Sequence, residues 1–240
     1  MDEGRAHETA WQGFWSEAPG EAGGVFWDAD PATTVAVHLT LFESHFIGGL
    51  PLVDIGCGNG TQTRYLARRF PRVVGTDLAP AAVAHARRAD PAGTVDFRTA
   101  DMADPATAGQ LHDELGDAHV YMRGVLHQCP PEERQPLVDG IATLLGARGR
   151  GFLVEPAEAA GALLRGLAAA PTGPPAKLAP VLAHGIAPGE VPDASVPVHV
   201  RAAGLGILAR GDLPLTTTET TEAGPIVLPS RWLLVTARER

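Results

Sequence analysis

The stretch PLVDIGCGNGTQ, residues 51–62, decides the fold. Its apolar run Leu52–Ile55 is typical of a buried strand, and three glycines follow at alternate positions: Gly56, Gly58 and Gly60. Glycine tolerates positive φ angles and lets a ligand approach the backbone closely, so such a turn commonly cradles a nucleotide-like ligand. The stretch therefore predicts a ligand site at the end of a buried β-strand.

Strand-like and helix-like segments alternate after this turn, which predicts a parallel sheet with helices on both faces. Ligands of such sheets bind beyond the carboxyl ends of the strands. At 240 residues the chain can bury a substantial core, and we expect one α/β domain. We predict strands at residues 52–55, 72–77, 94–101, within 119–127 and at 149–156, and helices within 61–70 and at 80–88 and 131–145.

Two segments interrupt this alternation. Residues 1–48 hold three of the four tryptophans, and residues 156–195 are rich in Pro, Gly and Ala. An insertion of this length is commonly a lid or substrate wall, the alternative being a mobile surface excursion. We expect two final strands within 206–215 and 231–239, joined by the polar segment 216–224. The single domain thus divides into a helical cap (1–48), a ligand-binding core (49–155), an insertion (156–195) and C-terminal strands (196–240).

The residues around the glycines indicate which ligand is bound. Asp54 lies in the strand before them, where a pyrophosphate would meet a like charge, so a phosphate ligand is disfavoured. Asp77 ends the second strand and can accept hydrogen bonds from both ribose hydroxyls. Asp101 can accept from an adenine amino group, and Met102 can pack on the adenine face. Adenine, ribose and a cationic amino-acid tail describe S-adenosylmethionine. Asp54 also has a second interpretation, as a residue that stabilises the loop through backbone N–H groups.

With these residues the chain resembles the class I S-adenosylmethionine-dependent methyltransferases. The resemblance implies a Rossmann-like sheet of seven mostly parallel strands whose last strand is antiparallel, with an aromatic N-terminal cap and the Pro-rich insertion after strand five. The matching segments are VDIGCGNGTQ (53–62), VVGTDLAP (73–80), DFRTADM (96–102) and HVYMRGVLHQCPPEE (119–133).

The same resemblance assigns cofactor-binding roles. The aromatic WQGFW (11–15), with Trp15, resembles the helix that covers the cofactor, although Trp11 and Trp15 are equally interpreted as core anchors of a docked helix. By position, Asp54, Gly56, Gly58 and Gly60 would bound the methionine portion, Asp77 and Leu78 the ribose and adenine, and Asp101 and Met102 the adenine, while Arg123 would lie near the amino-acid tail.

His127, just beyond the fourth strand, is the candidate catalytic residue. Methyl transfer from a sulfonium needs little acid–base assistance, because the leaving group departs neutral and the enzyme mainly aligns the reactants and excludes water. An alcohol or phenol acceptor benefits from a base, and an imidazole suits neutral pH. The alternative is that His127 positions the CPPEER turn that follows it.

Charge and composition limit the classes of binding partner and the cellular compartment that we expect. The chain carries 28 acidic and 19 basic residues, which argues against a nucleic-acid substrate. The acidic, polar start and the lack of a long apolar run predict neither a secretory signal nor a membrane span. Cys57 and Cys129 form no metal pattern, and Cys57 lies inside the glycine loop, so we expect no bound metal and a reducing cytoplasm.

These features predict methyl transfer to a small molecule. No (Asn/Asp)-Pro-Pro-(Tyr/Phe) signature is present, and the aromatic cap with the insertion favours an enclosed pocket. High Ala, Gly, Pro and Arg usage hints at bacterial natural-product or antibiotic biosynthesis. Two alternatives stay open: a non-methyl reaction such as a cyclisation or elimination on the same fold, and a non-catalytic partner subunit. A homodimer or a heteromeric biosynthetic complex is compatible with either.

Overall fold

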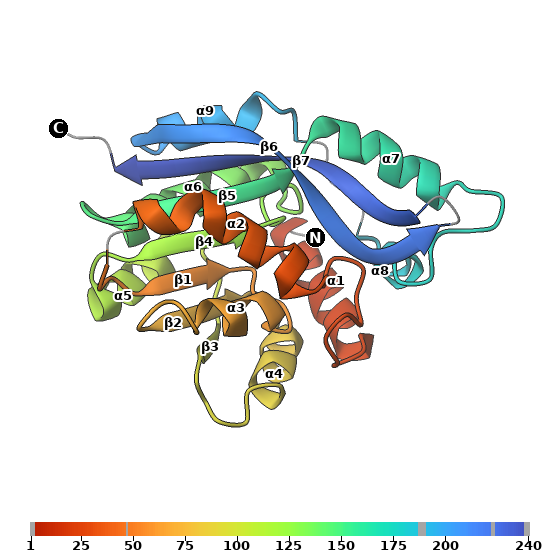
Figure 1. Cartoon of the computed structure of the whole chain (residues 1–240), viewed down its shortest axis with the longest axis horizontal. Helices are drawn as coiled ribbons and strands as arrows, with labels where there is room; N and C mark the ends of the chain where they lie inside the picture. The colour runs from red at the N-terminus through yellow and green to blue at the C-terminus, as the bar shows by residue number, and fades with distance from the viewer. Residues whose placement is uncertain (1–2, 47, 187–190, 222–223, 238–240) are drawn as a thin grey trace.

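A seven-stranded sheet forms the centre of the computed structural model, which describes residues 3–46, 48–186, 191–221 and 224–237 (Figure 1). The strand order is β3-β2-β1-β4-β5-β7-β6, and β7 runs antiparallel to both of its neighbours. This confirms the predicted Rossmann-like sheet with an antiparallel last strand. The strands are β1 (Leu52–Ile55), β2 (Val73–Asp77), β3 (Asp96–Thr99), β4 (His119–Arg123), β5 (Arg150–Pro156), β6 (Leu205–Thr221) and β7 (Gly224–Ala237).

Helices cover both faces of the sheet. Helices α5, α6 and α9 pack on one face, and α3, α4 and α7 pack on the other, where α1 docks on α4 and α2 on α3. The helices are α1 (Glu3–Glu17), α2 (Val35–Phe42), α3 (Thr61–Leu66), α4 (Pro80–Arg88), α5 (Pro105–Leu115), α6 (Pro131–Leu145), α7 (Glu158–Ala168), α8 (Ala179–Ala183) and α9 (Ser195–Ala202), with 3-10 turns at Pro31–Thr33 and Glu43–His45. None of the described helices is long and apolar enough to cross a membrane.

Helix α5 was not predicted from periodicity, although local signals mark its ends. Asp104 accepts hydrogen bonds from the backbone of Ala106 and Thr107, Pro105 opens the helix, and Gly116 at φ +69° ends it. Such caps and an initial proline are typical helix boundaries. A crossover here is required because β3 and β4 run in the same direction within one sheet.

Alternate residues of the central strands divide the core into two layers. In β1, Leu52 points to the layer beneath α1–α4, whereas Val53 points to the layer beneath α5, α6 and α9. In β5, Phe152 belongs to the first of these layers and Leu153 to the second. This period of two is the one a strand dictates. Asp54 lies two residues after Leu52 and therefore shares its face.

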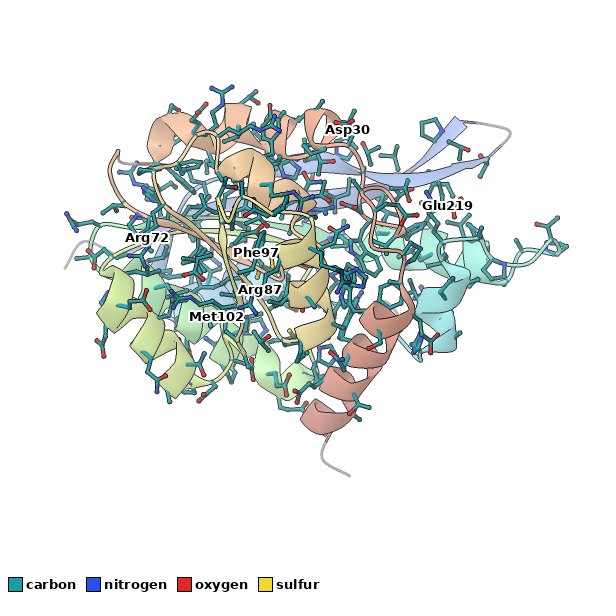
Figure 2. All side chains as sticks on the ribbon, turned by 90° about the horizontal axis from the view of Figure 1, so that it is seen from below. Asp30, Arg72, Arg87, Phe97, Met102 and Glu219 are labelled. Atoms are coloured by element: carbon teal, nitrogen blue, oxygen red, sulfur yellow. The ribbon has the colours of Figure 1, made fainter. Side chains whose placement is uncertain are left out.

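The edge strand β3 is fixed to α4. Arg87 on α4 donates from Nε to the carbonyl oxygen of Phe97 in β3 at 3.0 Å, and both residues are labelled in Figure 2. The Phe97 ring packs beneath Gly60: a Cβ at Gly60 would lie 2.6 Å from Cζ of that ring. Gly60 also has φ +75° and precedes α3. Close packing behind the loop, together with the positive φ angle, therefore explains why residue 60 is a glycine.

The C-terminal hairpin is longer than predicted. The polar segment 216–221, expected to join two strands, instead continues β6, because β-branched threonines suit an extended strand. Thr217 donates to the carbonyl oxygen of Ile226 at 2.8 Å, and the Thr218 backbone N–H donates to that of Phe26 at 2.9 Å. Residues 222–223 and 238–239 of these predicted segments lie outside the described residues. The hairpin extends past the sheet toward α8 (Figure 1).

The insertion packs against α1 and the segment that follows α1. Lys177, just before α8, donates from Nζ to the carbonyl oxygen of Gly23 at 2.8 Å. The hairpin contacts the same segment, because the Thr218 hydroxyl of β6 donates to the carbonyl oxygen of Val25 at 2.8 Å. His184, after α8, lies 3.2 Å from a carboxylate oxygen of Glu17 in α1. Residues 187–190 of the insertion lie outside the described residues. The described insertion, the segment after α1 and the hairpin thus form one continuous roof.

Candidate active site

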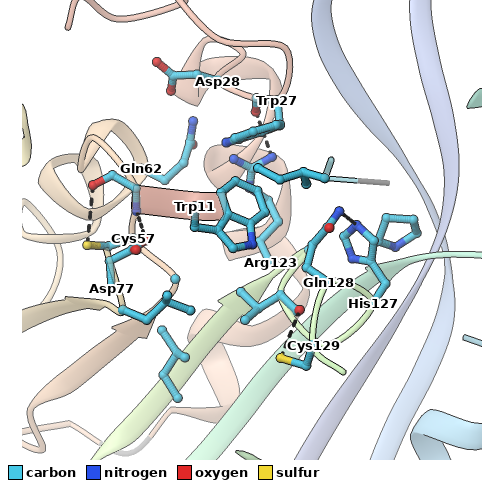
Figure 3. A pocket seen from close by; sticks show the side chains of 18 of the residues that line it. Trp11, Trp27, Asp28, Cys57, Gln62, Asp77, Arg123, His127, Gln128 and Cys129 are labelled. Carbon is cyan, nitrogen blue, oxygen red and sulfur yellow. Dashed lines mark hydrogen bonds between the residues drawn. The ribbon is translucent and has the colours of Figure 1, made fainter. Parts of the chain in front are cut away.

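A pocket lies at the carboxyl edge of the sheet, between the ends of β1, β2 and β4 and the N-terminal cap (Figure 3). All but one of the residues to which the sequence assigned a role line it. These are Trp15, Asp54, Gly56, Gly58, Asp77, Leu78, Asp101, Met102, Arg123 and His127. Gly60 does not line it, because it faces Phe97 in the core.

Two glycines shape the floor of the pocket. Gly56 and Gly58 have φ angles of +71° and +55°, in the region that favours glycine. A Cβ at Gly56 would lie 2.4 Å from Cγ2 of Val125, and one at Gly58 would lie 2.9 Å from the Trp15 ring. The Gly56 N–H is bonded to the carbonyl oxygen of Thr76 in β2. The turn is therefore pinned to the sheet and leaves no space for side chains.

Asp54 is a buried carboxyl, 3% exposed, on the pocket wall. The hydroxyl of Thr63 donates to it at 2.6 Å. Burial raises the pKa of Asp54 to about 7, against the opposing effects of this hydrogen bond and of Arg123. A buried carboxyl of this kind gains most from a positively charged ligand.

Asp77 stabilises the glycine loop through backbone N–H groups. This is the role that the sequence offered as the second interpretation of Asp54. Its two oxygens accept from the backbone N–H groups of Gly58 and Ala79, each at 2.9 Å. Burial raises the pKa of Asp77 to about 6, although both hydrogen bonds act to lower it. Each carboxylate oxygen can accept a second hydrogen bond, so bracing the loop and binding ribose hydroxyls are compatible.

Asp101 and Met102 follow β3 at the far end of the pocket. Asp101 is exposed, and one of its oxygens accepts from the Ala103 N–H at 2.8 Å. Met102 is buried in the layer beneath α6, but it also reaches the pocket wall. An acceptor oxygen beside a soft apolar side chain suits the edge and face of a purine.

Tryptophans form the cap above the glycine loop. Trp11 and Trp27 meet edge to face with ring centroids 5.4 Å apart, and Trp15 lies 6.2 Å from Trp27. The Trp15 carbonyl oxygen lies 2.9 Å from Nε2 of His85 on α4, which anchors the helix. Arg123 donates from Nη1 to the carbonyl oxygen of Trp27 at 3.0 Å (Figure 3). The tryptophans thus anchor the cap and line the pocket at once.

Asp28 and Asn59 join the cap to the glycine loop, and neither was predicted from the sequence. One Asp28 oxygen accepts from the Gly23 N–H at 2.7 Å, from Asn59 Nδ2 at 2.7 Å and from the Thr61 hydroxyl at 3.2 Å. Asp28 is 4% exposed. It lies in a segment without periodicity, so no local signal pointed to it.

His127 is held by Glu155, a residue that was not predicted from the sequence either. The Glu155 carboxylate, at the end of β5, lies 2.9 Å from His127 Nδ1 and is 4% exposed. It also accepts from the backbone N–H groups of Val125, Leu126 and His127. On the other side of the ring, the Gln128 amide nitrogen lies 2.7 Å from Nε2 (Figure 3). The sequence signal that could have pointed to Glu155 is its position as an acidic residue at the end of a parallel strand.

Two thiols also lie on the pocket wall. Burial raises the pKa of the Cys57 thiol well above its usual value and that of Cys129 to about 12. Both therefore stay protonated and are poor nucleophiles. Among the described residues, no group of three or more His, Cys, Asp or Glu side chains could hold a metal ion.

The donor set fits S-adenosylmethionine. The buried carboxyl of Asp54 suits a cationic tail, and Asp77 keeps acceptor capacity for a ribose. The turn formed by Gly56 and Gly58 brings backbone close to the ligand without a side chain between them. These features are the ones expected of the cofactor site of a class I methyltransferase.

Comparison with known proteins establishes the family. Residues 52–149 match the methyltransferase domain family. An S-adenosylmethionine-dependent methyltransferase from Anabaena variabilis, known from its crystal structure, is 32% identical in sequence to this chain. The two structures superpose with a TM-score of 0.89, and the match covers 96% of this chain and 95% of the Anabaena chain. The chain therefore belongs to the S-adenosylmethionine-dependent methyltransferases.

Curated relatives match a smaller part of the chain. A ubiquinone biosynthesis O-methyltransferase from Cereibacter sphaeroides is 43% identical over 85 residues, which is 35% of this chain and 33% of the relative. A magnesium-protoporphyrin O-methyltransferase from Rhodobacter capsulatus is 35% identical over 109 residues, which is 44% of each. The chain thus spans less than half of the length of these relatives.

Proposed function

We propose that this protein transfers the methyl group of S-adenosylmethionine to a hydroxyl oxygen of a small molecule. One observation carries the proposal: the imidazole of His127, oriented by Glu155, lines the same pocket as the glycine loop and the strand-end carboxyls. A cofactor site and an oriented base thus share one cavity.

Three residues on the cofactor side would each bind a different chemical group of S-adenosylmethionine. Asp54 would hold the ammonium group, Arg123 the carboxylate, and Asp77 the ribose hydroxyls. When bound, S-adenosylmethionine supplies an electrophilic methyl group on a sulfonium and departs as a neutral thioether. No acid is therefore needed for the leaving group, and the protein's task is alignment and exclusion of water.

His127 would take the proton of the acceptor hydroxyl. The Glu155 carboxylate accepts the Nδ1–H, which leaves the Nε2 lone pair available, as assigned from the hydrogen-bond network. Without an acceptor, that lone pair accepts from the Gln128 amide at 2.7 Å. The acceptor hydroxyl would replace this amide and donate its proton to Nε2 as the oxygen forms its bond to the methyl carbon.

The acceptor would be an intermediate of bacterial natural-product synthesis, methylated in the cytoplasm. The two curated relatives described above carry O-methyltransferase names, which supports an oxygen acceptor. An apolar roof over the pocket supports a compact organic molecule, because charged metabolites gain little from such walls. The chain's Ala, Gly, Pro and Arg usage supports the bacterial natural-product setting.

The test begins with calorimetric titration of the purified protein with S-adenosylmethionine. The protein is then incubated with the cofactor and an extract of the producing organism, and S-adenosylhomocysteine and methylated products are followed by mass spectrometry. We expect equal amounts of both, with the new methyl group on oxygen. Consumption of a small molecule without S-adenosylhomocysteine would indicate a non-methyl reaction, and cofactor binding without turnover would indicate a partner subunit.

A further inference from the structure

We infer that the acceptor of this enzyme is an uncharged, flat aromatic molecule. The inference rests on the proposed function, because it concerns the substrate of the same pocket. It comes from the distribution of charge and shape on the pocket wall.

The wall away from the cofactor residues is apolar. It is built from three parts of the chain: α7, the segment around α8, and the β6–β7 hairpin. Its aliphatic side chains are Leu164, Leu178, Val181, Ile186, Leu215 and Leu228. A charged group placed against them would lose its hydration without a compensating partner.

Most of the charged residues on the pocket wall are ones to which a cofactor role is assigned. Among the described residues that line the pocket, Arg123 is the one Arg or Lys, against five carboxylic residues: Asp28, Asp54, Asp77, Asp101 and Glu133. Arg123 already donates to the Trp27 carbonyl oxygen and acts electrostatically on Asp54. In the proposed function it also meets the cofactor's own carboxylate. No cation is left for an anionic acceptor.

A cationic acceptor is disfavoured by the same wall, because its aliphatic residues offer no carboxylate. Glu133, which also lines the pocket, lies on α6 and not on this wall. The polar groups next to them are short and neutral. Thr217 lines the pocket, but its hydroxyl is already bonded to the Ile226 carbonyl oxygen. What remains for the acceptor is an apolar surface, the neutral Thr216 and the His127–Gln128 pair.

The tryptophans add a preference for shape. Trp11 and Trp27 are half-buried, meet edge to face, and both reach the pocket (Figure 3). Phe26 lines the pocket beside Trp27. Aromatic rings prefer offset-stacked or edge-to-face partners, so a flat aromatic body gains more here than a flexible aliphatic one.

The test uses three probes of one shape and different charge: 2-naphthol, 2-naphthoate and 2-naphthylmethylammonium. Each is titrated at pH 7.5 into protein saturated with S-adenosylhomocysteine, and binding is measured by calorimetry and by quenching of tryptophan fluorescence. We expect 2-naphthol to bind about 100-fold more tightly than either ion. Equal or tighter binding of an ion, or binding of none of the three, would overturn the inference. Failure to bind S-adenosylhomocysteine would instead count against the proposed function.

A charge placed on the wall tests the cause of the selectivity. Leu178→Lys should improve 2-naphthoate relative to 2-naphthol by at least about tenfold, whereas the neutral Leu178→Met should leave their ratio unchanged. Thr216→Lys, on the β6 side of the pocket, serves as a second variant should Leu178→Lys fail to fold. Unchanged affinity for S-adenosylhomocysteine verifies that the cofactor half is intact. An unaltered ratio in a folded lysine variant would refute the inference.

Discussion

The Glu155 carboxylate lies 2.9 Å from Nδ1 of His127 and also accepts from the backbone N–H groups of Val125 and Leu126. One buried acid thus fixes both the ring and the turn that carries it. Since the carboxylate accepts at Nδ1, the ring's other nitrogen is the one that can receive a proton from a ligand.

Glu155→Gln is expected to lower kcat by about 10- to 100-fold, because a charged hydrogen bond worth about 1.5–3 kcal/mol is replaced by a neutral one. Cofactor affinity should stay near that of the wild type. Steady-state kinetics measures the fall in kcat, and calorimetric titration measures the affinity for S-adenosylmethionine.

The matched control for this prediction is Glu158→Gln, an exposed glutamate three residues further along the chain. It should leave kcat unchanged. If Glu155→Gln retained the wild-type kcat and only unfolded at a lower temperature, Glu155 would hold the turn without orienting the base.

Affinity for S-adenosylmethionine should depend on pH through Asp54. Burial raises the pKa of its carboxyl to about 7, so below that pH the group is protonated and cannot pair with an ammonium. Binding should therefore be about tenfold weaker at pH 6 than at pH 8, and should release a proton at the lower pH. Calorimetry in buffers of different ionisation enthalpy detects that proton.

Asp54→Asn should flatten this dependence and, without ligand, raise the melting temperature at pH 8 by a few degrees. The sign follows from the raised pKa: the protonated acid stabilises the fold at low pH, and this contribution is lost as the pH rises through about 7. A variant that binds the cofactor as tightly as the wild type at pH 8 would rule out the ammonium contact.

Asp77→Ala should weaken S-adenosylmethionine by about two orders of magnitude, which corresponds to about 2–4 kcal/mol for two lost charge-assisted hydrogen bonds. Part of this loss would come from the loop, since Asp77 also accepts from Gly58 and Ala79. Comparing S-adenosylmethionine with methylthioadenosine and with free adenine separates the ribose contact from the loop. Near-wild-type affinity in calorimetry would exclude Asp77 as the ribose ligand.

The sheet was predictable because its signals are local. The central parallel strands are short apolar runs next to a glycine or an acid. Asp77 and Asp101 follow from their positions at or just after strand ends, and Asp54 from its place before the glycine loop. The C-terminal hairpin was underestimated because a run of threonines looks like a polar connection by composition. Its extended form depends on pairing with β7 and on the bond from Thr218 to Phe26, which no local pattern encodes.

The part of the site that was not predicted depends on contacts between residues distant in sequence. Asp28 and Asn59 are 31 residues apart, and Glu155 and His127 are 28 apart. A residue's place at a strand end can be inferred, but its partner cannot. Gly60 shows the converse: it belongs to the glycine motif, yet its closest neighbour is the Phe97 ring in the core.

The insertion should govern acceptor binding and leave cofactor binding largely intact. Replacing residues 170–180 with a short Gly/Ser linker removes Leu178 from the pocket wall and the Lys177 bond to Gly23. Turnover should be lost, whereas calorimetric affinity for S-adenosylhomocysteine should change by less than about threefold. Lys177→Met, which removes the bond but keeps the wall, should cost less activity. Equal loss of both functions in the linker variant would mean that this segment supports the core.

His127→Ala is expected to lower kcat by about 10²–10⁴-fold with KM little changed, because the ring acts on the proton that leaves in the transition state. Gln128→Ala provides the contrast: its amide bonds Nε2 only until the acceptor arrives, so its loss should lower kcat far less than the loss of His127 does. Steady-state kinetics at saturating S-adenosylmethionine measures kcat for both variants. An alanine variant that keeps more than about a tenth of the wild-type kcat would mean that the hydroxyl loses its proton without His127.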